Sequence, residues 1–171
     1  KHSKVFFYKE RCINCQKCLS ACPNYALINV GRIDRNMCDS CGNCVEICAT
    51  SALSMVGREI TPEEVIKEVL KDKPFYDNSG GGMTLSGGEP TFQPDFTLEL
   101  LKLGKKNNIH TAMETCGYIK WEVLQKLMKF LDLVLFDVKH IDTHKHKEYT
   151  GVSNDLILKN LRNLSRYNLP R

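Results

Sequence analysis

Eight of the nine cysteines in this 171-residue chain form two runs with identical spacing, C-x2-C-x2-C-x3-C. The runs consist of Cys12, Cys15, Cys18 and Cys22, and of Cys38, Cys41, Cys44 and Cys48. A cysteine-rich short secreted chain would suggest a disulfide scaffold, but cysteines at such regular spacing are more typical of metal ligands. The runs therefore indicate metal binding in a reducing compartment.

The spacing matches the bacterial ferredoxin pattern, in which the fourth cysteine of each run ligates the second of two [4Fe-4S] clusters. This crossing-over predicts two sets of ligands. One set is Cys12, Cys15, Cys18 and Cys48, and the other is Cys38, Cys41, Cys44 and Cys22. Gly42 permits a tight turn in the second run, while Ala49 stands where the first run has Pro23.

Two zinc sites are the alternative, because C-x2-C pairs also bind zinc. Zinc would not explain a third and a fourth cysteine at the same spacing in both runs. The runs also belong to an internal repeat, since residues 12–27 align with residues 38–53 and bring Ala26 into register with Ala52. We therefore expect a ferredoxin-like domain over residues 1–57 with two [4Fe-4S] clusters.

Residues 58–171 show a different pattern, in which helices alternate with short apolar strands. Thr61, Pro62 and Glu64 form a capping-box signal for a first helix. Strands are expected at 83–86, 110–114 and 131–139, and helices at 92–106, 121–130 and 154–167. This order predicts a parallel sheet with right-handed crossovers, either an open α/β sheet or an arc of a barrel.

Polar motifs follow all three predicted strands, at the sheet edge where α/β folds bind their ligands. The motifs are SGGEP, ETCGY and DVK. Asp137 and Lys139 are two residues apart, so on a strand they share a face, and they could equally form a purely structural ion pair. The glycines of SGGEP could form a simple turn. The chain has neither a Walker A motif nor G-x-G-x-x-G.

The ordered motifs SGGGMTLSGGEPTFQP, ETCGY, DVK and HKEYTGVSN resemble those of the activating enzymes of glycyl radical enzymes. These are members of the radical S-adenosylmethionine (SAM) superfamily, in the branch with a ferredoxin-like insert. The resemblance spans essentially the whole chain. It implies an α+β ferredoxin-like insert joined to a partial α/β barrel of the (β/α) type, which is incomplete in residues 58–171.

The resemblance also implies a SAM site at the three strand ends. Its residues would be Gly87, Gly88, Glu89, Glu114, Thr115, Asp137, Val138 and Lys139. In the family, the backbone of the glycine motif binds the SAM ammonium group, and the lysine of the DxK motif is suited to a carboxylate. No catalytic residue follows from the resemblance, and no definite role for His146 or Gly151 in the HxxxTG motif.

One family motif is missing from the sequence. Family members cleave SAM at a further [4Fe-4S] cluster held by CxxxCxxC, which would come just before Lys1 in family order. We therefore expect this chain to be an internal segment of a longer enzyme, inactive alone, with the third cluster in the parent protein. Cys116 cannot replace three ligands, and we expect it to be a pocket or core residue.

In the whole enzyme, the resemblance implies reductive cleavage of SAM to a 5′-deoxyadenosyl radical, which takes hydrogen from a glycine of a partner enzyme. The two clusters of this chain would relay electrons from a small donor such as flavodoxin or ferredoxin. The rival hypotheses are a ferredoxin module fused to an α/β domain without SAM chemistry, and a zinc-stabilised interaction module.

The charge pattern favours neither nucleic acid nor membrane as a partner. The formal charge is +4, and each oxidised cluster with its four thiolates would add about −2. The lysines are scattered along helical patterns rather than gathered in a run. No apolar run reaches the roughly 18 to 20 residues of a membrane span, and no signal-peptide core is present, so we expect a cytoplasmic protein.

Overall fold

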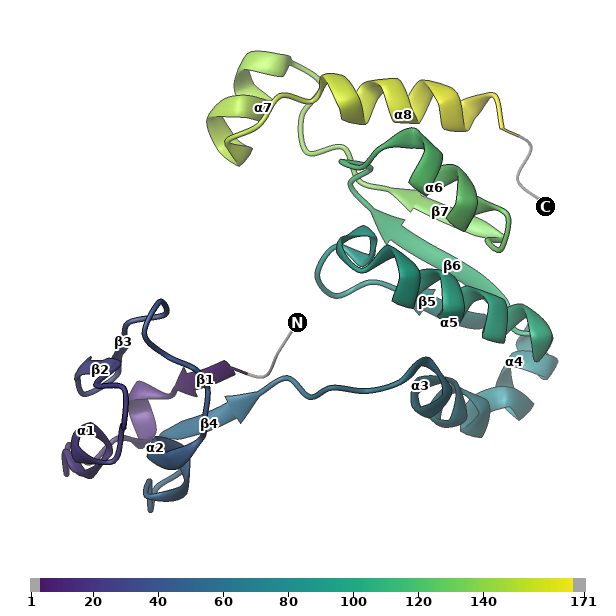
Figure 1. Cartoon of the computed structure of the whole chain (residues 1–171). Helices are drawn as coiled ribbons and strands as arrows, with labels where there is room; N and C mark the ends of the chain where they lie inside the picture. The colour runs from purple at the N-terminus through teal and green to yellow at the C-terminus, as the bar shows by residue number, and fades with distance from the viewer. Residues whose placement is uncertain (1–3, 168–171) are drawn as a thin grey trace. The chain divides into compact units, whose positions relative to one another are not determined.

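The computed structural model describes residues 4–167 and divides the chain into two compact units, Lys1–Ile60 and Thr61–Arg171 (Figure 1). The predicted domain boundary, after Gly57, lies in the segment between the last strand of the first unit and the first helix of the second. Residues 1–3 and 168–171, the outer ends of the predicted domains, lie outside the described residues.

The first unit consists of two short antiparallel strand pairs and small helices. In chain order its elements are β1 (Lys4–Phe7), the 3-10 helix η1 (Lys9–Arg11), α1 (Lys17–Ser20), β2 (Leu27–Asn29), β3 (Arg32–Ile33), α2 (Asn43–Glu46) and β4 (Leu53–Val56). β1 pairs antiparallel with β4, and β2 pairs antiparallel with β3. The pairing of β1 with β4 joins the two ends of the unit, and it was not predicted from the sequence.

The internal repeat is visible in the backbone conformation. Left-handed residues occur in pairs that are 26 positions apart. The pairs and their φ angles are Asn14 (55°) with Ser40 (61°), Gln16 (60°) with Gly42 (90°), Tyr25 (50°) with Ser51 (52°), and Gly31 (81°) with Gly57 (80°). Five of these eight residues are not glycines, although left-handed backbone is unfavourable for them. The two halves therefore share one backbone path around their cysteines.

The core of the first unit is small and contains thiols. Its buried residues are Val5, Cys18, Leu27, Cys44 and Leu53, and Cys22, Cys38 and Cys48 pack against them. The repeat-related Ala26 and Ala52 are each 1% exposed. A unit this short buries little apolar surface, so groups bound by its thiols would add substantially to its stability.

The second unit is a three-stranded parallel sheet with helices. In chain order its elements are α3 (Pro62–Val69), η2 (Leu70–Asp72), α4 (Lys73–Ser79), β5 (Gly82–Leu85), η3 (Pro90–Phe92), α5 (Pro94–Lys106), β6 (His110–Thr115), α6 (Trp121–Met128), β7 (Leu133–Phe136), α7 (Thr143–Thr150) and α8 (Asp155–Ser165). The strand order is β5-β6-β7, and both pairings are parallel. The parallel sheet predicted from the sequence is thus confirmed.

The predicted elements agree with the structure within a few residues, with one correction that concerns the site. The capping box is present, because the Thr61 hydroxyl accepts the Glu64 N–H at 3.2 Å and the Glu64 carboxylate accepts the Thr61 N–H at 2.7 Å. The last strand was predicted to reach Lys139, but β7 ends at Phe136. Asp137 and Lys139 therefore lie in the loop after the strand, so strand alternation does not place them on a common face.

One face of the sheet is covered by α5 and α6, and the opposite face carries exposed side chains (Figure 1). The buried cluster on the covered face consists of Leu101, Met113, Leu124, Leu127, Met128 and Leu131. Strand alternation and register place Thr84, Glu114 and Leu135 on the other face. Glu114 of β6 is directly opposite Leu135 of β7. Leu133 and Leu135 are 45% and 46% exposed there.

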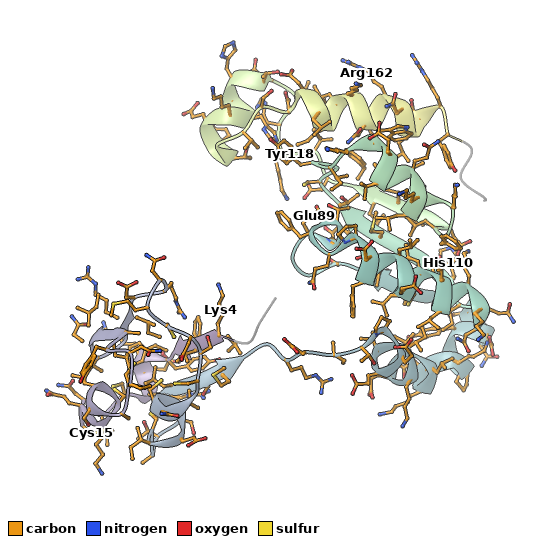
Figure 2. The ribbon with its side chains drawn as sticks, in the orientation of Figure 1. Lys4, Cys15, Glu89, His110, Tyr118 and Arg162 are labelled. Atoms are coloured by element: carbon orange, nitrogen blue, oxygen red, sulfur yellow. The ribbon has the colours of Figure 1, made fainter. Side chains whose placement is uncertain are left out.

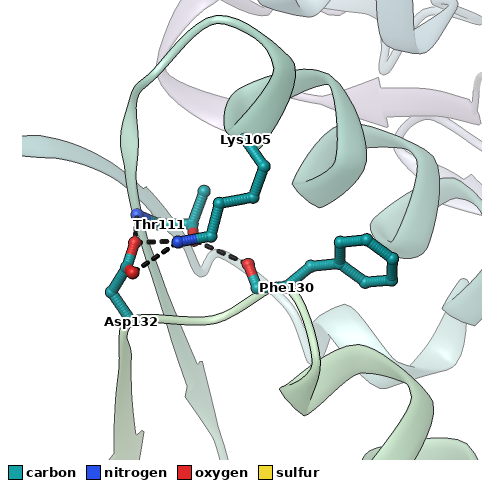
Figure 3. A network of polar contacts seen from close by, with 4 residues as sticks. All are labelled: Lys105, Thr111, Phe130 and Asp132. Carbon is teal, nitrogen blue, oxygen red and sulfur yellow. Dashed lines mark hydrogen bonds and ion pairs between the residues drawn. The ribbon is translucent and has the colours of Figure 1, made fainter. Parts of the chain in front are cut away.

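A polar network joins α5 to the amino end of β7 (Figure 3). Lys105 pairs with Asp132, whose other carboxylate oxygen accepts the Thr111 N–H at 2.8 Å. The Thr111 hydroxyl lies 2.7 Å from the Phe130 carbonyl oxygen. This network is at the end of the sheet opposite to the polar motifs, so it stabilises the fold without lining the candidate site.

Across residues 4–167, none of the helices is long and apolar enough to cross a membrane.

Candidate functional site

The first predicted ligand set is assembled in one place. Cys12, Cys15, Cys18 and Cys48 line a common cavity in the first unit, although Cys48 belongs to the second cysteine run. Burial raises the pKa of the Cys18 thiol, and the thiols of Cys15, Cys48 and Cys12 raise it further. Cys48 therefore lies beside the first run, and its ligation of the same cluster stays a prediction.

The second set shows the same arrangement. Burial raises the pKa of the Cys44 thiol to about 11, with further contributions from its neighbours Cys22, Cys38 and Cys41. The four predicted ligands of the second set are therefore neighbours in the structure. Within the described residues 4–167, no three His, Cys, Asp or Glu side chains are placed to hold a metal ion. The nature of the bound group stays a prediction.

Backbone N–H groups point at several of these sulfurs. Asn14 donates to Cys12 Sγ at 3.4 Å, Ala26 to Cys22 Sγ at 3.2 Å and Leu53 to Cys48 Sγ at 3.4 Å. Hydrogen bonds to ligand sulfurs tune the reduction potential of iron–sulfur clusters. The cysteine loops thus offer the donor set and the polar surroundings that a [4Fe-4S] cluster uses.

A second site lies at the carboxyl ends of β5, β6 and β7. A pocket of about 260 Å³ is lined by Ser86, Gly87, Gly88, Glu89, Glu114, Thr115, Cys116, Asp137 and Lys139. The volume equals roughly nine water molecules, which suits an amino-acid-sized group. The structure brings together every predicted SAM residue except Val138, which is half-buried and does not line the pocket.

Glu89 is held by the protein on both carboxylate oxygens. Its Oε1 accepts the Thr115 hydroxyl at 2.7 Å and the Thr91 hydroxyl at 2.8 Å, and its Oε2 accepts the Cys116 N–H at 2.9 Å. Burial alone would raise the pKa of Glu89, but these hydrogen bonds outweigh burial and lower it. Glu89 is therefore an ionised anchor that joins the glycine turn after β5 to the end of β6 (Figure 2).

The charged side chains Glu114, Asp137 and Lys139 of the pocket each have a polar partner. Ser86 donates to Glu114 Oε2 at 2.6 Å, and Lys139 pairs with Asp137. The Asp137 hydrogen bond and charge raise the pKa of Lys139, with a smaller contribution from Glu114. One ammonium and two accessible carboxylates thus face the same space. This charge pattern complements a zwitterionic amino-acid end, with its own ammonium and carboxylate.

The two glycines of the turn leave backbone accessible at the pocket. Gly87 has φ +98°, a conformation that favours glycine. A side-chain carbon at Gly88 would meet no protein atom within 4 Å, so the space beside this residue is open. The turn can therefore bring main-chain groups close to a ligand.

Comparison with known families decides what these two sites belong to. The sequence model of the radical SAM superfamily matches residues 37–171, and that of a 4Fe-4S dicluster domain matches residues 4–49. The first match covers well over half of the chain. The chain belongs to the radical SAM superfamily.

Among curated proteins, its relatives in the superfamily include several activating enzymes. It is 43% identical to isethionate sulfite-lyase activating enzyme of Nitratidesulfovibrio vulgaris over 90% of this chain and 42% of that protein. Identity is 44% with trans-4-hydroxy-L-proline dehydratase activating enzyme of Clostridioides difficile, over 95% of this chain and 55% of that protein. The chain spans about half the length of the curated relatives it matches.

A solved domain of pyruvate-formate lyase-activating enzyme from Bacteroides vulgatus is also similar. It shares 36% identity and covers 50% of this chain and 53% of that chain, with a TM-score of 0.47.

Two pocket residues, Ser86 and Cys116, were outside the predicted SAM set. Ser86 follows β5 on the same face as Glu114, so strand alternation was a signal that could have found it. Cys116 was expected to be a pocket or core residue, and it lines the pocket. Burial and the nearby Glu89 carboxylate raise the pKa of its thiol, which favours the neutral form.

The HxxxTG motif forms a buried corner between α7 and α8. His146 is 1% exposed, and its Nδ1 lies 2.8 Å from the Val152 carbonyl oxygen. Asn154 donates to the carbonyl oxygens of His140 and Ile141 at 2.9 and 2.8 Å, and it accepts the Thr143 hydroxyl at 2.8 Å. These contacts give His146 and its neighbours a positioning role for the chain after β7.

Asn160 of α8 holds the loop after β6 in place by hydrogen bonds. Its side-chain amide donates to the carbonyl oxygens of Gly117 and Ile119 at 2.8 and 2.7 Å. Asn160 is fully buried, within the apolar stripe of α8. A polar residue at a buried helical position was the available sequence signal for this contact.

Proposed function

We propose that this chain supplies two [4Fe-4S] clusters and part of the SAM site of an enzyme that installs a glycyl radical on a partner enzyme. The observation that carries the proposal is the pocket at the ends of β5, β6 and β7, where three separate motifs converge. The similarity to several activating enzymes, at 37–48% identity in the relatives compared, supports the activity and the class of partner.

Within this proposal, the residues of the second unit bind and orient the methionine end of SAM. The accessible backbone at Gly87 and Gly88 and the Glu114 carboxylate would hold the ammonium group. Lys139 would turn from Asp137 to the SAM carboxylate. Glu89 and Thr115 would keep the turn in position rather than contact the ligand, because their polar atoms already bond to each other.

The first unit would contribute electron transfer. When bound, a [4Fe-4S] cluster supplies reversible one-electron chemistry. The eight thiols would hold two clusters, and the N–H groups at Cys12, Cys22 and Cys48 would adjust their potentials. A third cluster, the one that cleaves SAM, is expected in the parent enzyme together with the remaining strands of the barrel.

The proposal predicts SAM binding by this chain even without the third cluster. Titration calorimetry on the full 171-residue chain, with its clusters loaded under anaerobic conditions, should detect binding that is weak, on the order of 1 mM. Weak binding is expected because this sequence lacks the CxxxCxxC motif, which in the family holds the cluster that chelates the methionine end of SAM.

Gly88→Ala gives the matched test of the site. The added methyl group meets no protein atom, so stability should be unchanged, but it fills space at the pocket wall and should weaken SAM binding about tenfold. Gly81→Ala adds the same group just before β5, against the flexible Ser79 side chain, and serves as the control. Equal SAM affinity in the wild-type and Gly88→Ala chains would contradict the proposed site, and so would no binding at all.

A further inference from the structure

The two cysteine loops share one backbone path but carry different charges. Residues 26 positions apart occupy equivalent places around the two ligand sets. At these places Arg11 corresponds to Met37, Ile13 to Asp39 and Lys17 to Asn43. The ligand geometry does not require this difference, since the cysteines and the left-handed positions are the same in both loops. The difference in charge therefore gives the two ligand sets different surroundings, which a binding partner could distinguish.

The first ligand set is bordered by four basic residues, which we call the basic surface: Lys9, Arg11, Lys17 and Arg32. Lys9 and Arg32 line a pocket together with Cys12, and Lys17 lines the cavity that contains Cys15. All four are exposed. In the part of the chain that the structure describes, none of them forms an ion pair with an acidic side chain. Their charge is directed to solvent.

Arg11 is fixed in position by a neighbouring ring. Its guanidinium carbon lies 4.4 Å from the centroid of the Tyr8 ring, and Tyr8 contacts the Phe6 ring edge-on at 4.9 Å. A guanidinium held in this way loses less freedom when it contacts an anionic partner.

The second ligand set has acidic surroundings. Asp39 is exposed, and it accepts the Cys41 N–H at 3.0 Å. Glu46 is exposed on α2. Arg35 is also exposed, and it keeps its positive charge while it donates to the Val5 carbonyl oxygen at 2.8 Å. The first set, even with the exposed Glu10 between Lys9 and Arg11, has more basic than acidic residues around it, whereas the second has more acidic than basic ones. An anionic protein would therefore be attracted to the first set in preference to the second.

The basic surface also contains features suited to a brief protein contact. Ile13 is 68% exposed and lines the same cavity as Lys17, and Cys15 is an exposed member of the ligand set. An exposed apolar residue close to charged residues is typical of protein interfaces, where the charges steer the approach. An exposed ligand thiol brings the surface within a short electron path of the cluster.

We propose that the basic surface is the docking site of a small acidic electron-carrier protein, so that electrons enter at the cluster held by Cys12, Cys15, Cys18 and Cys48. One electron passes from the reduced carrier, which is oxidised, to this cluster, which is reduced, and no bond or proton moves. The inference rests on the part of the proposed function that places clusters in the first unit. It does not depend on SAM binding.

The test uses the full chain with its clusters loaded and a flavodoxin of net negative charge as the probe. Lys9→Gln, Lys17→Gln and Arg32→Gln are combined in one variant. Its association with oxidised flavodoxin, followed by fluorescence anisotropy, should be about tenfold slower than that of the wild type at low salt. The difference should vanish between about 0.05 and 0.5 M salt, because the charges are then screened.

Cluster reduction gives a second readout. Bleaching of the visible absorbance by reduced flavodoxin should slow by the same factor, while bleaching by dithionite should be unchanged. The control combines Lys67→Gln, Lys126→Gln and Lys129→Gln, which remove the same charge from exposed positions of α3, α6 and the residue after α6. Equal effects of the two triple variants would overturn the proposal. Tighter binding of the chain to short single-stranded DNA than to flavodoxin would also overturn it.

Discussion

Individual residues of the pocket have roles that differ from those suggested by their motifs. Glu89 belongs to the SGGEP motif and was predicted to bind SAM, but its oxygens are bonded to Thr91, Thr115 and Cys116. Because each motif follows a predicted parallel strand, the sequence predicted that the motifs would meet at one edge of the sheet. The sequence could not predict that Thr115, 2% exposed, would face Glu89, because that contact depends on how two loops pack.

Asp132 should make the stability of the second unit depend on pH. Burial opposes its ionisation, but Lys105 and the Thr111 N–H lower its pKa below the ordinary value. A lowered folded-state pKa adds stability that is complete above the unfolded pKa of about 3.9 and is lost as pH falls through the folded pKa. Asp132→Asn should therefore cost about 1 to 2 kcal/mol at pH 7, measured by urea unfolding with Trp121 fluorescence.

The cost of Asp132→Asn should shrink below about pH 4, where the wild-type carboxyl group itself takes up a proton. Asp77→Asn is the control, since Asp77 forms an exposed pair with Lys73 along one helix and should cost less than about 0.5 kcal/mol. A cost for Asp132→Asn that stays constant down to pH 3 or so would show that ionisation of this group does not stabilise the fold.

Among the elements, those with an apolar period were predictable and those without one were not. β5, β6, α5 and α6 carry the apolar residues that form the main core, and their positions were predicted within a few residues. α7 (THKHKEYT) has one buried residue, His146, so it offers no apolar stripe. Its fold depends on the contacts of Asn154 with the chain before it, which periodicity cannot show.

Asn154→Ala should release α7 selectively. The change leaves the His140 and Ile141 carbonyl groups and the Thr143 hydroxyl without their partner, at a cost of about 2 kcal/mol or more. Hydrogen exchange should then become faster at Thr143–Thr150, while β6 keeps its protection. Asn163→Ala, farther along α8, is the control. Equal acceleration in all elements of the unit would show that the corner does not hold α7 specifically.

At the scale of the whole chain, spacing predicted which cysteines would gather, because the repeat leaves one regular pattern to follow. The structure brings Cys48 to the first run and Cys22 to the second. The antiparallel pairing of β1 with β4 could not be predicted in the same way. It joins Val5 to Met55 across the whole unit, and both strands are only four residues long.

Double substitutions can test the crossing-over by iron content. The wild-type chain should bind about eight iron atoms, four in each cluster. Cys15→Ser with Cys48→Ser disables one predicted cluster and should leave about four, whereas Cys15→Ser with Cys22→Ser disables both and should leave little iron. Cys116→Ser should keep the full content, because Cys116 lies at the other site.

Equal iron in the two double variants would contradict the crossing-over. Stoichiometric zinc without sulfide would support the zinc alternative instead.

The paired left-handed residues of the first unit separate the positioning of the thiols from the choice of the surface side chains around them. The backbone path alone positions the thiols, and it does so with asparagine, glutamine, tyrosine and serine as well as glycine. Side chains between the cysteines are then free to vary without disturbing the ligands. Such a unit can change its partner through substitutions of a few surface residues in one half. The other half then keeps the original loop unchanged.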